Sequence, residues 1–207
     1  MGREKIKFLS ALAMIFVVLS SNSYADQGAC GIIPAWPELE ENDLERLIGL
    51  NQSRIKGLSA ALKSTNKQDR EYVANLYENG FLQIENPNDL AGKYNCRTIK
   101  LGGLSEIIIY KWFKCEIFSE ENALVIKKTT GSQNFMGVLV PAGEGLSYSG
   151  ALNYGYEKIY KLYGQDKSRN QVGCLNAIDK DITSLILEMP EPEFESFHDI
   201  ILLEKDN

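Results

Sequence analysis

Histidine is almost missing from this chain of 207 residues, which contains His198 and no other. Catalytic triads and most zinc sites use histidine as the base or as a ligand, so the material for both is scarce. Ser196 and Asp199 lie next to His198 in the sequence, but in a strand residue 199 points away from the face that 196 and 198 share. We therefore predict no triad at His198, no metal site and no cofactor.

Other motifs that carry chemistry are also incomplete. The pair Asp179 and Asp181 lacks the glycine and the bidentate glutamate of a calcium loop. The glycine-rich stretches TGSQNFMG and PAGEGLSYSG lack the lysine of a phosphate loop, so we interpret their glycines as hairpin turns. Glu193 and Glu195 are two close carboxylates of the kind that glycoside hydrolysis uses, and they keep a carboxylate-based hydrolase open as the alternative function.

The chain has no apolar run long enough to form a transmembrane helix, which needs about 20 residues. Its longest apolar run, residues 8–20, follows a basic start and precedes the small residues of "SYA". This order is typical of a secretory signal peptide, and we predict residues 1–25 as the signal, cleaved after Ala25. A lipoprotein, modified at Cys30, is the alternative, but Gln27 stands where a lipobox has leucine.

Basic clusters are absent as well. Residues 1–25 hold three basic residues and one acidic residue, so 19 basic and 27 acidic residues remain after cleavage, a net charge of −8. Nucleic acid and anionic lipid are therefore poor candidates as partners. We expect a periplasmic or secreted protein, a monomer, with no transmembrane segment after signal removal.

The four cysteines contain no C-x-x-C pair, which argues against a redox or zinc motif. In an oxidising compartment an even number of cysteines predicts two disulfides, and four cysteines allow three pairings.

Two helices are predicted in the first part of the mature chain. Six apolar residues at spacings of three, four and seven give a helix over residues 43–63 one apolar face: Leu44, Leu47, Ile48, Ile55, Leu58 and Leu62. We expect this face to pack on the rest of the protein and Asn42 or Asp43 to cap the helix. The stretch from Gln68 to Gly80 predicts a second, shorter helix that ends at the glycine.

After residue 93 the hydrophobic period changes to two. About eight strands are predicted, at 93–101, 106–118, 123–129, 134–140, 146–153, 170–178, 183–189 and 196–204. Their close spacing leaves no room for crossover helices, except near YEKIYKLYG, and favours an antiparallel arrangement. We predict an α+β fold: one domain over residues 26–207, in which a helical part, 36–80, packs on an antiparallel, barrel-like sheet, 93–204.

Five motifs resemble, in order, a bacterial family of envelope proteins, the domain of unknown function numbered 4893. They are GKYNCRTIKLGG, YKWFKCEIF, KKTTGSQNFMG, YGQDKSRNQVG and LILEMPEPEFESFHDIILLE. The resemblance covers roughly residues 36–204. The resemblance implies a shared fold and an envelope location but no activity. Asn134 departs from the pattern, since the family usually has arginine there.

The resemblance also bears on the disulfides. Cys96 and Cys115 match the family's own cysteine pair and fall on neighbouring predicted strands of one hairpin, so we expect them to be bonded. Cys30 and Cys174 are additions of this chain, and they form the remaining pair.

Six polar residues of the family-like motifs are our candidates for a ligand site at the mouth of the barrel: Arg97, Lys100, Ser132, Gln133, Tyr148 and Arg169. An eight-stranded barrel is just wide enough for side chains or for one small ligand. Alternatively, Arg97 and Arg169 pair with carboxylates such as Asp166, Glu195 or Asp199. The sequence thus favours a non-catalytic module that binds a small molecule or a partner.

Overall fold

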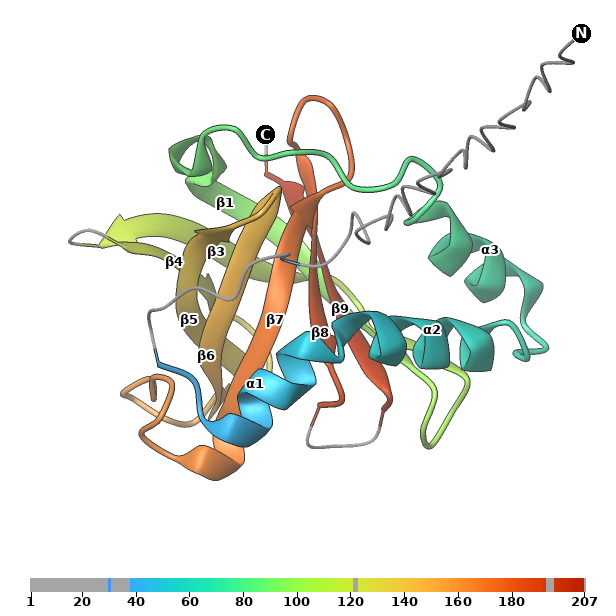
Figure 1. The fold of residues 1–207 in the computed structure, drawn as a ribbon, viewed down its shortest axis with the longest axis horizontal. Helices are drawn as coiled ribbons and strands as arrows, with labels where there is room; N and C mark the ends of the chain where they lie inside the picture. The colour runs from blue at the N-terminus through green and yellow to red at the C-terminus, as the bar shows by residue number, and fades with distance from the viewer. Residues whose placement is uncertain (1–29, 31–37, 121–122, 193–195, 207) are drawn as a thin grey trace, which may run out of the picture.

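The barrel is built from antiparallel strands that follow one another around its wall (Figure 1). The structure is a computed structural model, which describes residues 30, 38–120, 123–192 and 196–206. The strands in this part of the chain are β1 (Gly92–Leu101), β2 (Ile107–Ile109), β3 (Phe113–Glu120), β4 (Ala123–Lys128), β5 (Gln133–Ala142), β6 (Gly145–Tyr154), β7 (Asn170–Ala177), β8 (Ser184–Pro190) and β9 (His198–Lys205). The predicted antiparallel α+β architecture is confirmed.

Pairing between the first and last long strands closes the barrel. β1 runs antiparallel to β9 along most of its length, from Tyr94 opposite Lys205 to Leu101 opposite His198. On its other side β1 pairs with β3 through its first half and with the short β2 through its last three residues. Eight strands thus form the wall, and β2 is an additional strand.

The single strand expected over residues 106–118 was wrong, because it is interrupted at residues 110–112. There Trp112 lies against Arg97 on the outside of β1, with the guanidinium carbon 4.2 Å from the ring centroid. Both halves still pair with β1, so the predicted hairpin survives the interruption.

The inside of the barrel is filled with apolar side chains. Alternate residues of every long strand point inward, and the largest of them, Tyr94, Phe135 and Tyr148, are almost fully buried. Leu139, Leu175, Leu187, Ile201 and similar residues fill the space between them. A barrel of eight strands leaves little more room than this, so the interior is a packed core.

Three helices lie on the outer wall (Figure 1): α1 (Glu41–Ile48), α2 (Leu50–Ala61) and α3 (Lys67–Asn75). α2 approaches the barrel through small residues, since Ser53, Gly57 and Ala61 are all buried. A Cβ atom at Gly57 would lie 2.7 Å from the Cβ of His198, so the close approach needs glycine at this position.

The apolar face predicted for the first helix was wrong in part. Leu47 is buried, but Ile48, Ile55 and Leu62 expose 67%, 65% and 70% of their surface. The face that meets the barrel is instead the one with small residues, because these let the helix come close to strands β8 and β9. The single helix predicted over residues 43–63 was also wrong, because two helices, α1 and α2, meet at Gly49. The N-cap of α1 is Glu40, not Asn42 or Asp43, and no side chain caps the helix.

Two disulfides tie distant parts of the chain together. Cys96 is bonded to Cys115 inside the barrel wall, with Cα atoms 5.8 Å apart. Cys30 is bonded to Cys174, 144 residues further along and on the outer side of β7. Closing a loop of that length restricts the unfolded chain more than the short loop does.

Candidate functional site

A cavity of about 80 Å³ opens at one end of the barrel. Residues of β1, β4, β5, β6, β7, β8 and β9 line it together with residues of α1 and of the segment before β7. Its polar members include Lys100, Lys128, Gln133, Gln171 and Asp199. The volume suits a few water molecules or one very small ligand, because pockets for drug-sized molecules measure about 300–1,000 Å³.

Lys128 is the most unusual residue of the cavity. It is 5% exposed, and its ammonium group donates a hydrogen bond to the backbone oxygen of Gln133. The ring of Phe113 lies 4.1 Å from Nζ, and no carboxylate pairs with this group among the described residues. Burial lowers the pKa of Lys128 to about 8. A buried lysine without a carboxylate partner is rare and costly, so its presence needs an explanation.

Opposite Lys128, two charged residues face each other across the closing pair of strands. Lys100 of β1 stands in register with Asp199 of β9, and both are more than 90% buried. Asp199 also accepts a hydrogen bond of 2.5 Å from the hydroxyl of Ser196. The two strands therefore bring one cation and one anion to the same side of the cavity.

Arg169 closes the rim from the segment that precedes β7. It donates hydrogen bonds of 2.7 and 2.9 Å to the two carboxylate oxygens of Glu157, and its Nε lies 3.3 Å from Asp166. Asp166 is thus one of the carboxylates expected for it. Hydrogen bonds from Lys161 and Ser168 lower the pKa of Asp166 to about 2. These contacts hold the rim in place and leave Arg169 largely neutralised.

The other predicted site residues are spread over different places. Gln133 lines the cavity with Lys100 and Arg169, whereas Ser132 stands exposed in the turn before β5. Tyr148 lies deep in the core and is fully buried. Arg97 points out of the barrel, where it lies over Trp112 and donates a hydrogen bond of 3.3 Å to Tyr72. Three of the six candidates therefore meet at the cavity.

Sequence reasoning missed Lys128, Gln171 and Asn134. Lys128 shares the inward register of Leu124 and Ile126 in β4, which is a signal that the alternating pattern carries. Asn134 is 5% exposed, and its Oδ1 has no hydrogen-bond partner. It lines the cavity at the position where the resemblance leads us to expect arginine.

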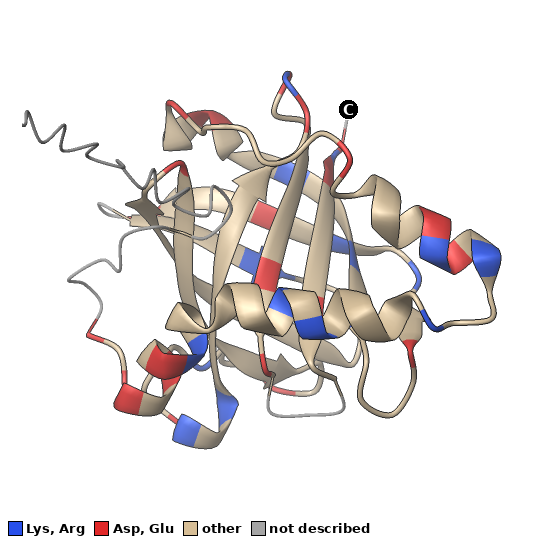
Figure 2. Ribbon diagram, turned by 45° about the vertical axis from the view of Figure 1, so that its right-hand side comes forward, with Lys and Arg blue, Asp and Glu red and all other residues tan. Residues whose placement is uncertain are grey.

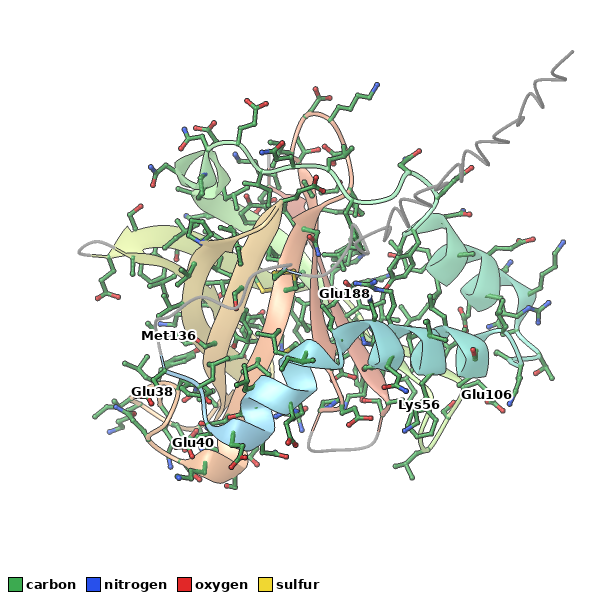
Figure 3. The ribbon with its side chains drawn as sticks, in the orientation of Figure 1. Glu38, Glu40, Lys56, Glu106, Met136 and Glu188 are labelled. Carbon is green, nitrogen blue, oxygen red and sulfur yellow. A yellow bond between two sulfur atoms is a disulfide. The ribbon has the colours of Figure 1, made fainter. Side chains whose placement is uncertain are left out.

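A second polar cluster lies between α2 and the outer wall of the barrel, where Figure 3 labels Glu188. Ser53 Oγ is 2.9 Å from His198 Nδ1, and His198 Nε2 is 3.2 Å from Glu188 Oε1. The order serine, histidine, carboxylate is that of a hydrolase triad. However, the three residues are at most 2% exposed, so no substrate reaches the hydroxyl of Ser53 in this conformation.

The contacts of this cluster indicate a structural role, and we call it the structural lock. The guanidinium of Arg54 donates two hydrogen bonds of 2.6 Å to the carboxylate of Glu188, and Tyr77 donates one of 2.9 Å to the same carboxylate. Burial alone would raise the pKa of Glu188, but the hydrogen bonds of Arg54 and His198 outweigh it and lower the pKa. Ser53 also donates to the backbone oxygen of Phe197. The cluster thus fastens α2 and the segment that follows α3 to the barrel.

Within the described residues, no helix is long and apolar enough to cross a membrane. In the same part of the chain, no group of three or more histidine, cysteine, aspartate and glutamate side chains is placed to hold a metal ion. Figure 2 shows both signs of charge spread over the helices and the barrel.

A family model for a domain of unknown function, DUF4893, matches residues 37–203. The chain belongs to the DUF4893 family. This match covers all of the described helices and almost all of the barrel, so the family is a family of antiparallel barrels with an N-terminal helical arm. No curated protein and no solved structure gives a significant match.

Proposed function

We propose that this DUF4893 protein is an exported, non-catalytic module that binds a small anion at the mouth of its barrel. The charge of the cavity supports the sign of the ligand. Four basic residues line it: Arg46, Lys100, Lys128 and Arg169. Arg46 is paired with Asp43 and Arg169 with Glu157 and Asp166, but no carboxylate of the described residues pairs with Lys128.

Lys128 is the observation that carries the proposal. Its ammonium group is buried at a cost that its one hydrogen bond to Gln133 does not offset. A carboxylate or phosphate oxygen in the cavity would supply the missing charge partner and further hydrogen bonds. The bound state would then raise the pKa of Lys128 back toward its ordinary value.

The carboxylate-based hydrolase has less support. It depended on Glu193 and Glu195, which lie outside the described residues. Hydrolysis of this type needs two carboxylates across a cleft, and the described lining of the cavity supplies Asp199.

Replacing Lys128 by methionine tests the binding proposal. We expect inorganic phosphate or acetate to raise the melting temperature of the native protein, and to have no such effect on Lys128→Met. Without ligand, the variant is expected to melt about 2–4 °C higher, the shift that about 1 kcal/mol gives in a domain of this size. Both effects follow from removing a buried charge that serves binding and not folding.

Lys127→Met is the matched control, because Lys127 is the preceding residue of the same strand and lies on the outer face, over Tyr160. It should leave anion binding unchanged.

The sign of the pH dependence of stability follows from the pKa of Lys128. Since the pKa of Lys128 is about 8 when folded and about 10.5 when unfolded, native stability relative to Lys128→Met should rise from pH 8 upward. Anion binding should weaken over the same range. If phosphate and acetate raised the melting temperatures of Lys128→Met and Lys127→Met equally, the proposal would be contradicted.

The exported location has its own support and test. Both disulfides suit an oxidising compartment, and the bond to Cys174 occupies the sulfur of Cys30 that a lipid anchor would use. When the full chain is expressed in a Gram-negative host, we expect a periplasmic protein that begins at Asp26, with cysteines that react with maleimide only after reduction. A cytoplasmic product with four reactive thiols would refute this.

A further inference from the structure

The outer face of the helical arm carries an apolar stripe that no described residue covers. Ile48, Ile55 and Leu62 follow each other at intervals of seven residues, and each exposes about two thirds of its surface. Leu44 and Leu58 stand beside them at spacings of three and four and are half-buried. Such a 3-4 pattern is the seam by which one helix packs against another.

Single exposed apolar residues are ordinary, but a row of three is not. Ile48 is the last residue of α1, Ile55 lies in α2 and Leu62 is the C-cap of α2, so the row runs across the junction of the two helices. The stripe faces away from the barrel, because the opposite side of α2 holds the buried residues Leu50, Gly57 and Ala61. The helical arm therefore presents one apolar side to the barrel and a second one to the solvent.

The charges beside the stripe change sign along the helix. Glu41 and Glu45 are exposed in α1, whereas Lys56 is exposed in α2 and Lys63 in the turn that follows it. In Figure 3 the labels of Glu40 and Lys56 mark these two parts of the helical arm. Two copies of this helix side by side in the same direction would place like charges together. In opposite directions, each acidic end meets a basic end.

We propose that the stripe is the interface of an antiparallel homodimer, in which α1 and α2 pack against the same helices of a second copy. The two-fold axis passes near Ile55, so that Ile55 meets its own counterpart. Ile48 then faces Leu62 of the second copy, and Glu45 lies beside Lys63. The same patch is used on both subunits, as a two-fold interface requires.

This inference is independent of the anion site, since the stripe and the cavity share no residue. It replaces the monomer expected from the sequence with a weak, reversible dimer. A contact between two helices of this length belongs at the lower end of specific interfaces, so it forms at high concentration or in a confined compartment.

Cysteine cross-linking tests the arrangement directly. The four native cysteines are all bonded, so Ile55→Cys adds one free thiol. Under mild oxidation we expect a covalent dimer of the mature protein from Ile55→Cys. Lys56→Cys is the control, because residue 56 is also exposed but lies about 100° around the helix. No dimer from Ile55→Cys, or equal dimer from both variants, would overturn the proposal.

Charge exchange tests the direction of the two helices. Sedimentation of the unmodified mature protein up to about 1 mM should show a monomer–dimer equilibrium, and Ile55→Lys should weaken it at least tenfold. Glu45→Lys and Lys63→Glu should each weaken it, and the double variant should restore it. Sedimentation as a monomer throughout this range, or a double variant weaker than both single ones, would show that the stripe does not serve self-association.

Discussion

Arg54→Met is expected to destabilise the protein by about 3–5 kcal/mol, although it removes one charge from a partly exposed helix. Arg54 holds both oxygens of Glu188 at 2.6 Å, and Glu188 is fully buried. Without the guanidinium, the Glu188 carboxylate keeps Tyr77 and His198 as hydrogen-bond partners. It loses Arg54, the cation that neutralises its negative charge. Chemical denaturation of the two proteins at pH 7 measures the difference. Lys56→Met, which removes an exposed charge from the same helix, should change stability by less than about 0.5 kcal/mol.

The double variant Arg54→Met, Glu188→Leu separates the cost of an unpaired charge from the loss of packing. Because it leaves no buried charge behind, we expect it to recover most of the lost stability. In the native protein the pKa of Glu188 is held below its ordinary value, so the folded state binds fewer protons than the unfolded state near pH 4. The contribution of Glu188 is therefore present at neutral pH and is lost as the pH falls through the folded pKa. A single variant as stable as the double one would mean that the unpaired charge of Glu188 is not what destabilises the single variant.

Much of the barrel could be predicted from the sequence, because each long strand is an alternating run that ends at a turn. The strand expected at 134–140, for example, lies within β5, and the one expected at 146–153 lies within β6. The first helix shows where this reasoning stops. Its six aliphatic residues share a face, but Ser53, Gly57 and Ala61 decide the packing, since a helix with small residues comes closer to a sheet. The spacing of apolar residues along the sequence does not predict how closely a helix approaches a sheet.

The site could be predicted less well, for a related reason. Lys100, Gln133 and Arg169 meet at the cavity because three segments, far apart in the sequence, end at the same rim. Lys128 looks like an ordinary surface lysine beside Lys127, and only its place in the alternation of Leu124 and Ile126 separates the two. The cluster of Ser53, Glu188 and His198 was missed because its serine comes from a helix about 140 residues away from the strands that carry the other two.

Tyr148→Ala is expected to cost about 3–5 kcal/mol, the range for removing a large aromatic side chain from a packed core. The ring fills the middle of the barrel: a Cβ at Gly137 would lie 2.4 Å from its Cε2, and one at Gly150 would lie 2.2 Å from its hydroxyl. Phe135 meets it edge-on, with ring centroids 6.1 Å apart. Two glycines and a tyrosine thus share one space, so removing the ring leaves a cavity between them.

Tyr148→Phe distinguishes this structural role from the ligand role that the sequence suggested. The phenol hydroxyl donates one hydrogen bond of 3.2 Å to Gln171, a residue that lines the cavity. We expect its loss to cost about 1 kcal/mol and to leave anion binding within about twofold of the native value, because the ring and the cavity wall remain. Calorimetric titration with phosphate, run beside Lys128→Met, checks this. If Tyr148→Phe abolished binding as fully as Lys128→Met does, Tyr148 would belong to the site, and the ligand would reach deeper into the barrel than the cavity does.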